Sequence, residues 1–310
     1  MIDQEVSALL DLLNSGFPAV EEMTGAHARA AVAARRAPVT NLDDVRETED
    51  VTLDVDGGTV GLRVYRPHGP EAARPLVLFL HGGGFVFCDV ESHDGFARLT
   101  ARSLGAVVVS VDYRRAPEHR APTAAEDAYA ALGWAVAHAD ELGVDPRRVL
   151  VAGDSAGGNL AAVVCLLARD RRGPAIAGQV LLYPVLDPSC ATPSYETYGT
   201  GWFNTAAAMR WYWQQYLGDA APGPATAPSL VEDLSGLPPA VVVLAGNDPL
   251  RSEGEEYAAR LAAAGVPTVA RVHAGLFHGF VTILPLRAAA AARELLWSDV
   301  ARLLAIEATA

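Results

Sequence analysis

The sequence predicts an α/β fold in which a mostly parallel central sheet is flanked by helices on both faces. Short apolar runs, each long enough for one strand, recur along most of the chain. Amphipathic helical stretches separate most of the later runs, as the crossovers between parallel strands require. With 310 residues the chain can enclose one large core, and we expect a single catalytic domain over residues 1–310.

The chain is expected to open with two short helices. Apolar residues recur at helical spacing at Val6, Leu9, Leu10 and Leu13, and an alanine-rich segment continues to about residue 34. The strand candidates that follow are residues 51–55, 59–65, 76–80, 107–111, 149–152, 180–183, 241–245 and 268–272. The turn Asp56-Gly57-Gly58 joins the first two, which predicts an antiparallel hairpin.

Residues 187–228 do not fit the alternation of strands and helices. The segment has proline, glycine and alanine at its ends and aromatic residues in its middle, including three of the five tryptophans of the chain. We interpret it as an insertion into the α/β pattern.

The most informative motif is Gly153-Asp154-Ser155-Ala156-Gly157, between the strand candidate at 149–152 and an apolar helical run at 159–167. Glycines two residues before and after a serine allow a sharp strand-to-helix turn that exposes the hydroxyl. The positive end of the helix would favour negative charge that develops beside Ser155. Ser155 is therefore a candidate nucleophile for acyl transfer, although the motif alone also fits a simple tight turn.

A second glycine cluster, His81-Gly82-Gly83-Gly84-Phe85, directly follows the strand candidate at 76–80. An ester carbonyl attacked by a serine becomes a tetrahedral oxyanion, which needs fixed hydrogen-bond donors. The backbone N–H groups of Gly83, Gly84 and Ala156 are the candidate donors. The alternative is a flexible glycine turn.

A serine nucleophile needs a base that a carboxylate orients. Asp248 and His278 both follow strand candidates, and the ends of the strands are where an α/β sheet gathers its ligands. The chain order Ser155, Asp248, His278 fits such a triad. The alternatives are a plain turn at Asp248 and a histidine at the edge of the core at His278.

With these motifs the chain resembles the hormone-sensitive-lipase group of α/β-hydrolases, the bacterial family IV carboxylesterases. The resemblance covers nearly the whole chain and rests on five stretches in order: His81 to Phe85, Asp112-Tyr113-Arg114 with Ala116-Pro117-Glu118-His119, Gly153 to Asn159, Asp248-Pro249-Leu250-Arg251, and His278-Gly279-Phe280. It implies an α/β-hydrolase fold, Ser155 as nucleophile, His278 as base and Asp248 as its orienting carboxylate. It also implies an oxyanion hole at Gly83, Gly84 and Ala156.

Two positions depart from the family pattern. Arg115 stands where a leucine is usual, and Ser252 stands where an acidic residue often follows the Asp248 motif. The second departure changes the polar surroundings of Asp248, so Glu253 remains an alternative for the carboxylate role.

The resemblance further implies a helical cap over the mouth of the site, formed by about residues 1–46 and the insertion at about 187–228. An apolar cap would bury an acyl or aryl group and exclude water. The candidates for substrate contacts are Phe85, Trp202, Phe203, Trp211 and Phe277. The alternative is that the aromatic residues of the insertion only attach the cap to the core.

We therefore predict a serine carboxylesterase that needs no cofactor, and the resemblance suggests short- to medium-chain esters as substrates. An amidase or arylacetamide deacetylase, or a lactonase, would use the same triad. A hydrolase-derived ligand-binding receptor would keep the fold without the chemistry. The presence of Ser155, Asp248 and His278 disfavours a receptor.

The composition limits the possible binding partners, the disulfide content and the cellular location of the protein. A formal net charge of −13 without a basic cluster argues against nucleic acid and anionic membrane surfaces as partners. Three cysteines are too few for a disulfide framework; we expect Cys165 in the core and Cys88 near the pocket. The chain start does not resemble a secretory signal and no apolar run reaches membrane-spanning length, so we expect a cytoplasmic enzyme.

Three further expectations concern polar residues and assembly. The spacing of His81, His93 and His119 matches no metal-ligand pattern, so we expect structural hydrogen bonds there and no metal site. We expect Arg114 to pair with Glu118. The last strand candidate, Thr268 to Val272, is expected at a sheet edge through which two copies could form a homodimer.

Overall fold

The computed structural model describes residues 2–69 and 73–306. Within these residues an eight-stranded sheet runs in the order β1-β2-β4-β3-β5-β6-β7-β8. The second strand pairs antiparallel with β1 and β4, and all other neighbours pair in parallel. This sheet confirms the fold class and the eight strand candidates. The strands are β1 (Glu47–Val55), β2 (Gly58–Arg66), β3 (Arg74–Leu80), β4 (Val107–Asp112), β5 (Val144–Asp154), β6 (Gly178–Leu182), β7 (Ala240–Asn247) and β8 (Thr268–Phe277).

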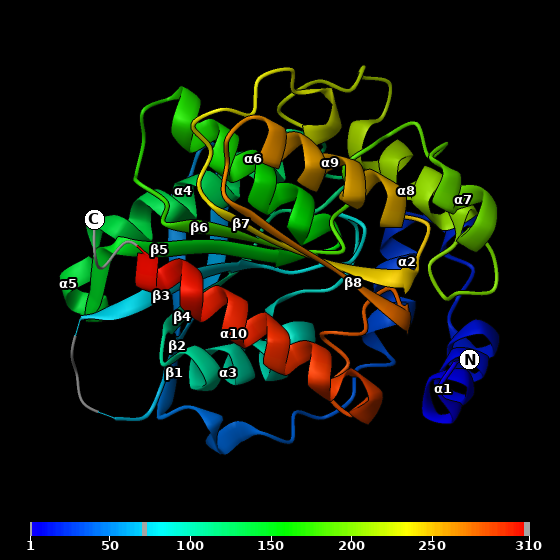
Figure 1. The fold of residues 1–310 in the computed structure, drawn as a ribbon, viewed down its shortest axis with the longest axis horizontal. Helices are drawn as coiled ribbons and strands as arrows, with labels where there is room; N and C mark the ends of the chain where they lie inside the picture. Colours follow the sequence, from blue (N-terminus) through cyan, green and yellow to red (C-terminus); the bar gives the residue numbers. More distant parts are fainter. Residues whose placement is uncertain (1, 70–72, 307–310) are drawn as a thin grey trace.

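Helices cover both faces of the sheet (Figure 1). One face carries α3 (Val90–Leu104) and α10 (Ala290–Ile306), and the other carries α4 (Thr123–Ala137), α6 (Ala156–Asp170) and α9 (Arg251–Ala263). Short elements complete the chain: α5 (Ala139–Leu142), η1 (Val20–Glu22), η2 (Leu42–Asp44), η3 (Pro228–Leu230) and η4 (Arg287–Ala289).

Successive side chains of the central strands enter two hydrophobic cores, one on each face of the sheet. On β3, Leu76, Leu78 and Leu80 join the core beneath α4 and α6, whereas Val77 and Phe79 join the core beneath α3 and α10. Because successive side chains of a strand point to opposite faces, a strand that is apolar at every position must be covered on both sides. The apolar runs of the sequence therefore require the two helical layers.

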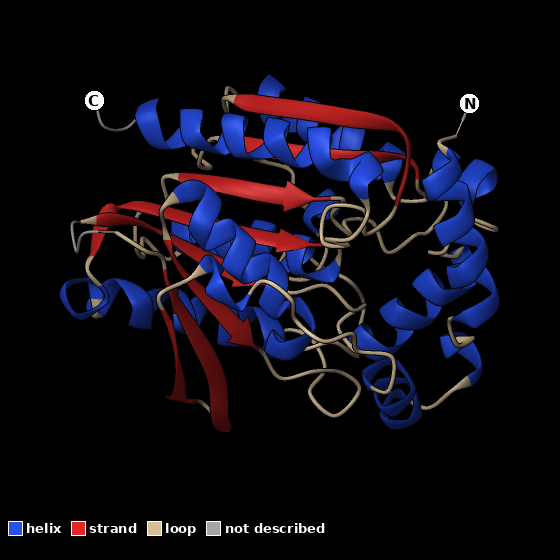
Figure 2. Cartoon of the chain, turned by 90° about the horizontal axis from the view of Figure 1, so that it is seen from below, coloured by secondary structure: helices blue, strands red, loops and turns tan. Residues whose placement is uncertain are grey.

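The two segments expected to form a cap lie together beyond the carboxyl ends of the parallel strands (Figures 1 and 2). The N-terminal segment contains the two expected helices, α1 (Gln4–Gly16) and α2 (Gly25–Ala33), and the insertion contains α7 (Pro193–Tyr198) and α8 (Ala206–Leu217). The side chain of Asn14 joins them, because Nδ2 donates to the Gly201 carbonyl oxygen at 2.8 Å and Oδ1 accepts from the Phe203 N–H at 3.0 Å.

The predicted ion pair between Arg114 and Glu118 is wrong. Arg114 pairs with Asp127 of α4 at 2.6 Å, and Glu118 pairs with Arg29 of α2. Asp127 is buried beside the Arg114 backbone, whose N–H it also accepts at 3.0 Å, while Glu118 is half-exposed toward the N-terminal segment. The tertiary packing of two helices thus overrides the proximity of Arg114 and Glu118 in sequence.

Residues 2–69 and 73–306 contain no helix with both the length and the apolar character that a bilayer crossing demands.

Candidate active site

Ser155 occupies a strained turn between β5 and α6. Its φ of 55° and ψ of −117° are unusual for a residue with a side chain. The flanking glycines allow this turn: a Cβ on Gly153 would lie 2.2 Å from the Gly157 carbonyl oxygen, and one on Gly157 would lie 1.9 Å from the Leu80 carbonyl oxygen. Only glycine fits at either position, and the strain raises the Ser155 side chain above the strand end.

Asp248 and His278 meet Ser155 from the ends of two other strands. Asp248 follows β7 and His278 follows β8. The Nδ1 atom of His278 lies 2.7 Å from Oδ2 of Asp248, and its Nε2 atom lies 2.9 Å from Oγ of Ser155. The second carboxylate oxygen, Oδ1, accepts the Leu250 N–H at 3.0 Å. In this arrangement Asp248 accepts the Nδ1 proton, which leaves the Nε2 lone pair directed at the serine hydroxyl.

Glu253, the alternative carboxylate, has other partners. Its Oε1 accepts the N–H groups of Leu186 and Asp187 at 2.7 and 3.3 Å. Burial raises its pKa well above the ordinary value. The geometry therefore favours Asp248 over Glu253 beside His278.

The glycine cluster after β3 lies beside Ser155 in a conformation that needs glycine. Gly83 has a φ of +117°, and a Cβ there would lie 2.2 Å from the Phe87 carbonyl oxygen. Gly84 has a φ of +58°, and its Cβ would lie 2.3 Å from the ring of Tyr212. The third candidate donor, Ala156, is the first residue of α6, where backbone N–H groups have no acceptor within the helix.

Asp154 joins this loop to the serine turn. From the sequence we expect a structural hydrogen-bonding role for this residue, but no pattern indicates its partners. Its Oδ1 accepts the Gly82 N–H at 2.8 Å and lies 3.2 Å from Nε2 of His93. Burial disfavours the charged carboxylate, but the interactions with His93 and Gly82 outweigh it and lower the pKa of Asp154. His81 stacks on Tyr113 with ring centroids 4.3 Å apart, and burial lowers its pKa to about 3, so its ring is neutral.

The matches to known proteins agree with this geometry. A family model described as alpha/beta hydrolase fold matches residues 77–282. The chain belongs to the α/β-hydrolase family. Its relatives include the carboxylic ester hydrolase LipN of Mycobacterium tuberculosis, 46% identical over 275 residues that cover 86% of this chain and 72% of LipN. The ethyl acetate hydrolase of Pseudomonas putida is 37% identical, with 90% of this chain and 92% of the relative covered.

A solved structure extends the likeness of this α/β-hydrolase to nearly the whole chain. The hyperthermophilic esterase of the archaeon Pyrobaculum calidifontis superposes with a TM-score of 0.88 at 39% identity, covering 98% of both chains. Together with the named esterases, this match confirms the resemblance that the five sequence stretches indicated.

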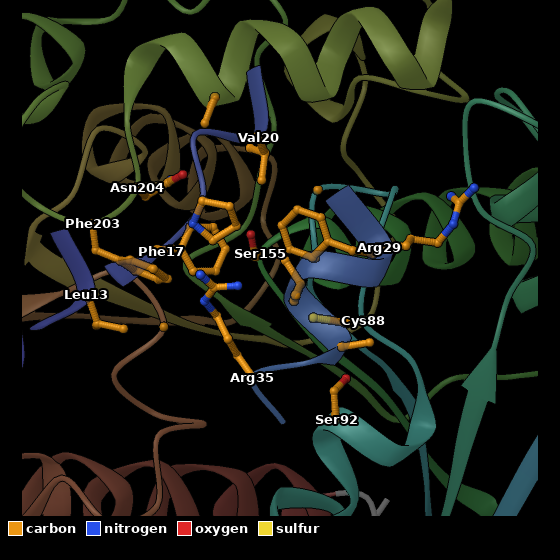
Figure 3. A pocket seen from close by; sticks show the side chains of 18 of the residues that line it. Leu13, Phe17, Val20, Arg29, Arg35, Cys88, Ser92, Ser155, Phe203 and Asn204 are labelled. Atoms are coloured by element: carbon orange, nitrogen blue, oxygen red, sulfur yellow. The ribbon is translucent and has the colours of Figure 1, made fainter. Parts of the chain in front are cut away.

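A cavity of about 1190 Å³ opens over Ser155 and His278 of the hydrolase (Figure 3). The N-terminal segment contributes an apolar wall that includes Leu13, Phe17 and Val20. The insertion contributes Phe203, Asn204, Thr205, Ala208 and Tyr212, and the loop after the glycine cluster contributes Phe87 and Cys88. The site is thus a large pocket with mostly apolar walls around Ser155.

Of the five aromatic residues expected to contact substrate, only Phe203 is among the described residues that line this pocket. The prediction that Phe85 contacts substrate is wrong. Its ring is buried and stacks on Tyr216 with the ring centroids 3.9 Å apart, because a φ of 64° turns it toward α8. The remaining three pack against protein: Trp202 on Tyr198, Trp211 on Tyr212, and Phe277 on Phe203.

The sequence reasoning missed several aromatic residues that line the hydrolase pocket or contact His278. Phe17, Phe87 and Tyr212 line the pocket, and Tyr183 packs edge-on against His278 at 4.8 Å between ring centroids. These residues come from four separate segments, and no local spacing or motif relates them.

Proposed function

We propose that this protein is a serine carboxylesterase that hydrolyses short- to medium-chain carboxylic esters through an acyl-enzyme on Ser155. The observation that carries the proposal is the chain of two hydrogen bonds from Ser155 through His278 to Asp248. Relatives named as ester hydrolases support the reaction class. The proposed reaction needs no cofactor.

The geometry supports a two-step mechanism. His278 takes the proton of Ser155 as its Oγ attacks the ester carbonyl, and Asp248 stabilises the resulting imidazolium. The oxyanion is stabilised by the N–H groups of Gly83, Gly84 and Ala156 and by the N-terminus of α6. His278 then returns its proton to the leaving alcohol, and water hydrolyses the acyl-enzyme by the same steps.

The proposal includes a cap of about residues 1–46 and 187–228. Leu13, Phe17 and Phe203 from these segments surround the pocket. Such walls would bury an acyl chain and keep bulk water away from the developing oxyanion. We also propose a cytoplasmic location, which agrees with the free thiols of Cys88, Cys165 and Cys190.

The same triad would serve an amidase or a lactonase, which differ in the leaving group and in the shape of the pocket. A ligand-binding receptor on this fold would have no use for a base aligned on a strained serine. The hydrogen bond between His278 and Ser155 therefore favours a hydrolase over a receptor.

The test is hydrolysis of p-nitrophenyl esters from acetate to palmitate by the native protein and by Ser155→Ala. We expect the highest kcat/KM with short or medium chains. Turnover should fall by a factor on the order of 10⁴ or more in the variant. Ser229→Ala, a serine outside the pocket lining, is the matched control and should keep native activity. Retained turnover in Ser155→Ala would exclude the mechanism.

A further inference from the structure

One wall of the pocket carries a polar side chain among apolar neighbours. Asn204 is only 7% exposed and lines the cavity that contains Ser155. Phe17, Val20 and Phe203 surround it on the same side, and Figure 3 shows the tip of its side chain directed into the pocket. A wall that served only a hydrocarbon chain would have no need of an amide here.

The Asn204 amide has no hydrogen-bond partner within residues 2–69 and 73–306. Its Nδ2 is buried and unpaired, whereas Oδ1 is not among the buried unpaired atoms and so remains accessible. No residue of this part of the chain donates to Oδ1. The cost of the unpaired Nδ2 is the same with and without a ligand. Oδ1, in contrast, gains a hydrogen bond from a ligand hydroxyl and loses its contact with water to a ligand methyl group. The cavity that contains Ser155 therefore presents a hydrogen-bond acceptor without a protein donor.

Hydrogen bonds fix the backbone on both sides of Asn204. The Asn204 N–H donates to the Trp202 carbonyl oxygen at 2.8 Å. Asn14 of α1 binds the backbone of Gly201 and Phe203 on the preceding turn. On the following side, Thr205 caps α8 by accepting the Ala208 N–H at 3.1 Å. A buried side chain on a fixed backbone loses less freedom on ligand binding than one on a mobile loop, so its hydrogen bond can discriminate between ligands.

We propose that Asn204 determines specificity by accepting a hydrogen bond from a hydroxyl group of the substrate. The preferred substrates are then esters with a hydroxyl on the acyl or the alcohol part. This inference rests on the proposed esterase function, because the hydroxyl is recognised while the ester carbonyl lies at Ser155. A methyl group in place of the hydroxyl would leave Oδ1 unpaired, which is how such a site disfavours the apolar analogue.

Two pairs of esters test the proposal, each exchanging one methyl for one hydroxyl group. Ethyl 3-hydroxybutanoate against ethyl 3-methylbutanoate probes the acyl side, and 2-hydroxyethyl butanoate against propyl butanoate probes the alcohol side. The readout is the ratio of kcat/KM for the two members of a pair. Because the native protein and the variants are given the same esters, a difference in this ratio between them does not come from the intrinsic reactivity of the esters.

We expect Asn204→Leu to lower the ratio about tenfold in one pair, the size of a single hydrogen bond. That pair identifies the part of the substrate that carries the hydroxyl. Asn204→Asp keeps acceptor oxygens in the same shape and should retain most of the native ratio. Gln214→Leu removes an exposed amide from α8 and should leave the ratio unchanged.

The possible outcomes distinguish a failure of the Asn204 proposal from a failure of the esterase proposal. Turnover of the methyl-bearing esters by Asn204→Leu shows that the variant is folded and active. An unchanged ratio in both pairs overturns the role of Asn204 and leaves the esterase function standing. If the native protein hydrolyses none of the four esters, the esterase function fails and this inference fails with it.

Discussion

At the scale of single residues, Asp154 links the two loops of the proposed site. Its carboxylate accepts the Gly82 N–H and lies 3.2 Å from Nε2 of His93. Because Gly82 directly precedes Gly83 and Gly84, this bond sets the position of the candidate donors relative to Ser155. We therefore expect Asp154 to position the loop of the candidate oxyanion donors and not to take the proton of Ser155.

We expect Asp154→Ala to lower kcat about a hundredfold with little change in KM, because displaced donors stabilise the oxyanion poorly. Asp154→Asn keeps an acceptor for Gly82 and should recover part of the loss. Steady-state kinetics with p-nitrophenyl butyrate measure both effects. The exposed Asp170, which pairs with Arg169, supplies the control Asp170→Asn. A rise in KM with unchanged kcat would contradict this role.

Glu253 makes the stability of the protein depend on pH. Burial raises its pKa well above the ordinary 4.5, the Leu186 and Asp187 N–H groups oppose that shift, and the charges of Asp187 and Asp248 add to it. Between the ordinary and the raised pKa, the folded protein keeps a proton that the unfolded chain has released. Stability contributed by this group is therefore present below 4.5 and is lost as the pH rises toward the raised pKa.

Glu253→Gln should remove this loss, because glutamine is uncharged and still accepts the two N–H groups. We expect the variant to gain in Tm relative to the native protein as the pH rises from about 5 to about 8. Thermal unfolding across this range measures the gain. Glu255→Gln changes an exposed partner of Arg251 and should show no such trend. A constant difference in Tm at every pH would contradict the expected titration.

At the scale of elements, Arg35 ties α1 to α2. Its Nε donates to the Gly16 carbonyl oxygen at 3.0 Å, and its Nη1 donates to the Ala31 carbonyl oxygen at 2.7 Å. Gly16 ends α1, where carbonyl groups have no partner within the helix and the dipole favours a positive charge. One side chain thus stabilises the end of α1 and the wall that it contributes to the pocket.

We expect Arg35→Met, which keeps the apolar stem, to speed amide hydrogen exchange in α1 and to raise KM for medium-chain esters. Exchange measured by mass spectrometry over residues 4–16 reports the first effect. Arg287→Met is the matched control. Arg287 also contacts α1, through Glu5, but its side chain is 90% exposed, and an exposed ion pair contributes little to stability. Equal exchange in the two variants would show that Arg35 does not hold α1.

At the scale of the whole molecule, β8 forms one edge of the sheet. Val269 and Val272 on this strand are 36% and 40% exposed. An uncovered edge strand with exposed apolar side chains can pair with another chain. A homodimer through Thr268 to Val272 therefore stays a prediction of both the sequence and the sheet order.

Sedimentation velocity tests this assembly. We expect a dimer in the native protein and a shift toward monomer in Val272→Lys, because lysine on an edge strand opposes pairing. Leu230→Lys alters another exposed apolar residue away from β8 and should leave the dimer intact. A single monomeric species at all concentrations of native protein would rule the dimer out.

The strands, the two N-terminal helices, the hairpin and the order of Ser155, Asp248 and His278 could be predicted from the sequence. Each rests on a local signal: the apolar period of one segment, a glycine whose Cβ would clash, or a polar residue just past a strand. In a parallel α/β sheet such positions converge at one edge, so local signals were enough to predict the catalytic candidates.

Only the tertiary structure decided the partners of Arg114 and Glu118, the direction of the Phe85 ring, the contact of Asp154 with His93, and the position of Asn204 in the pocket wall. Each of these depends on segments far apart in the chain, whose relative positions follow from the packing of whole helices and loops. Side-chain direction and long-range pairing are set by that packing, so the periodicity and motifs of one segment do not determine them.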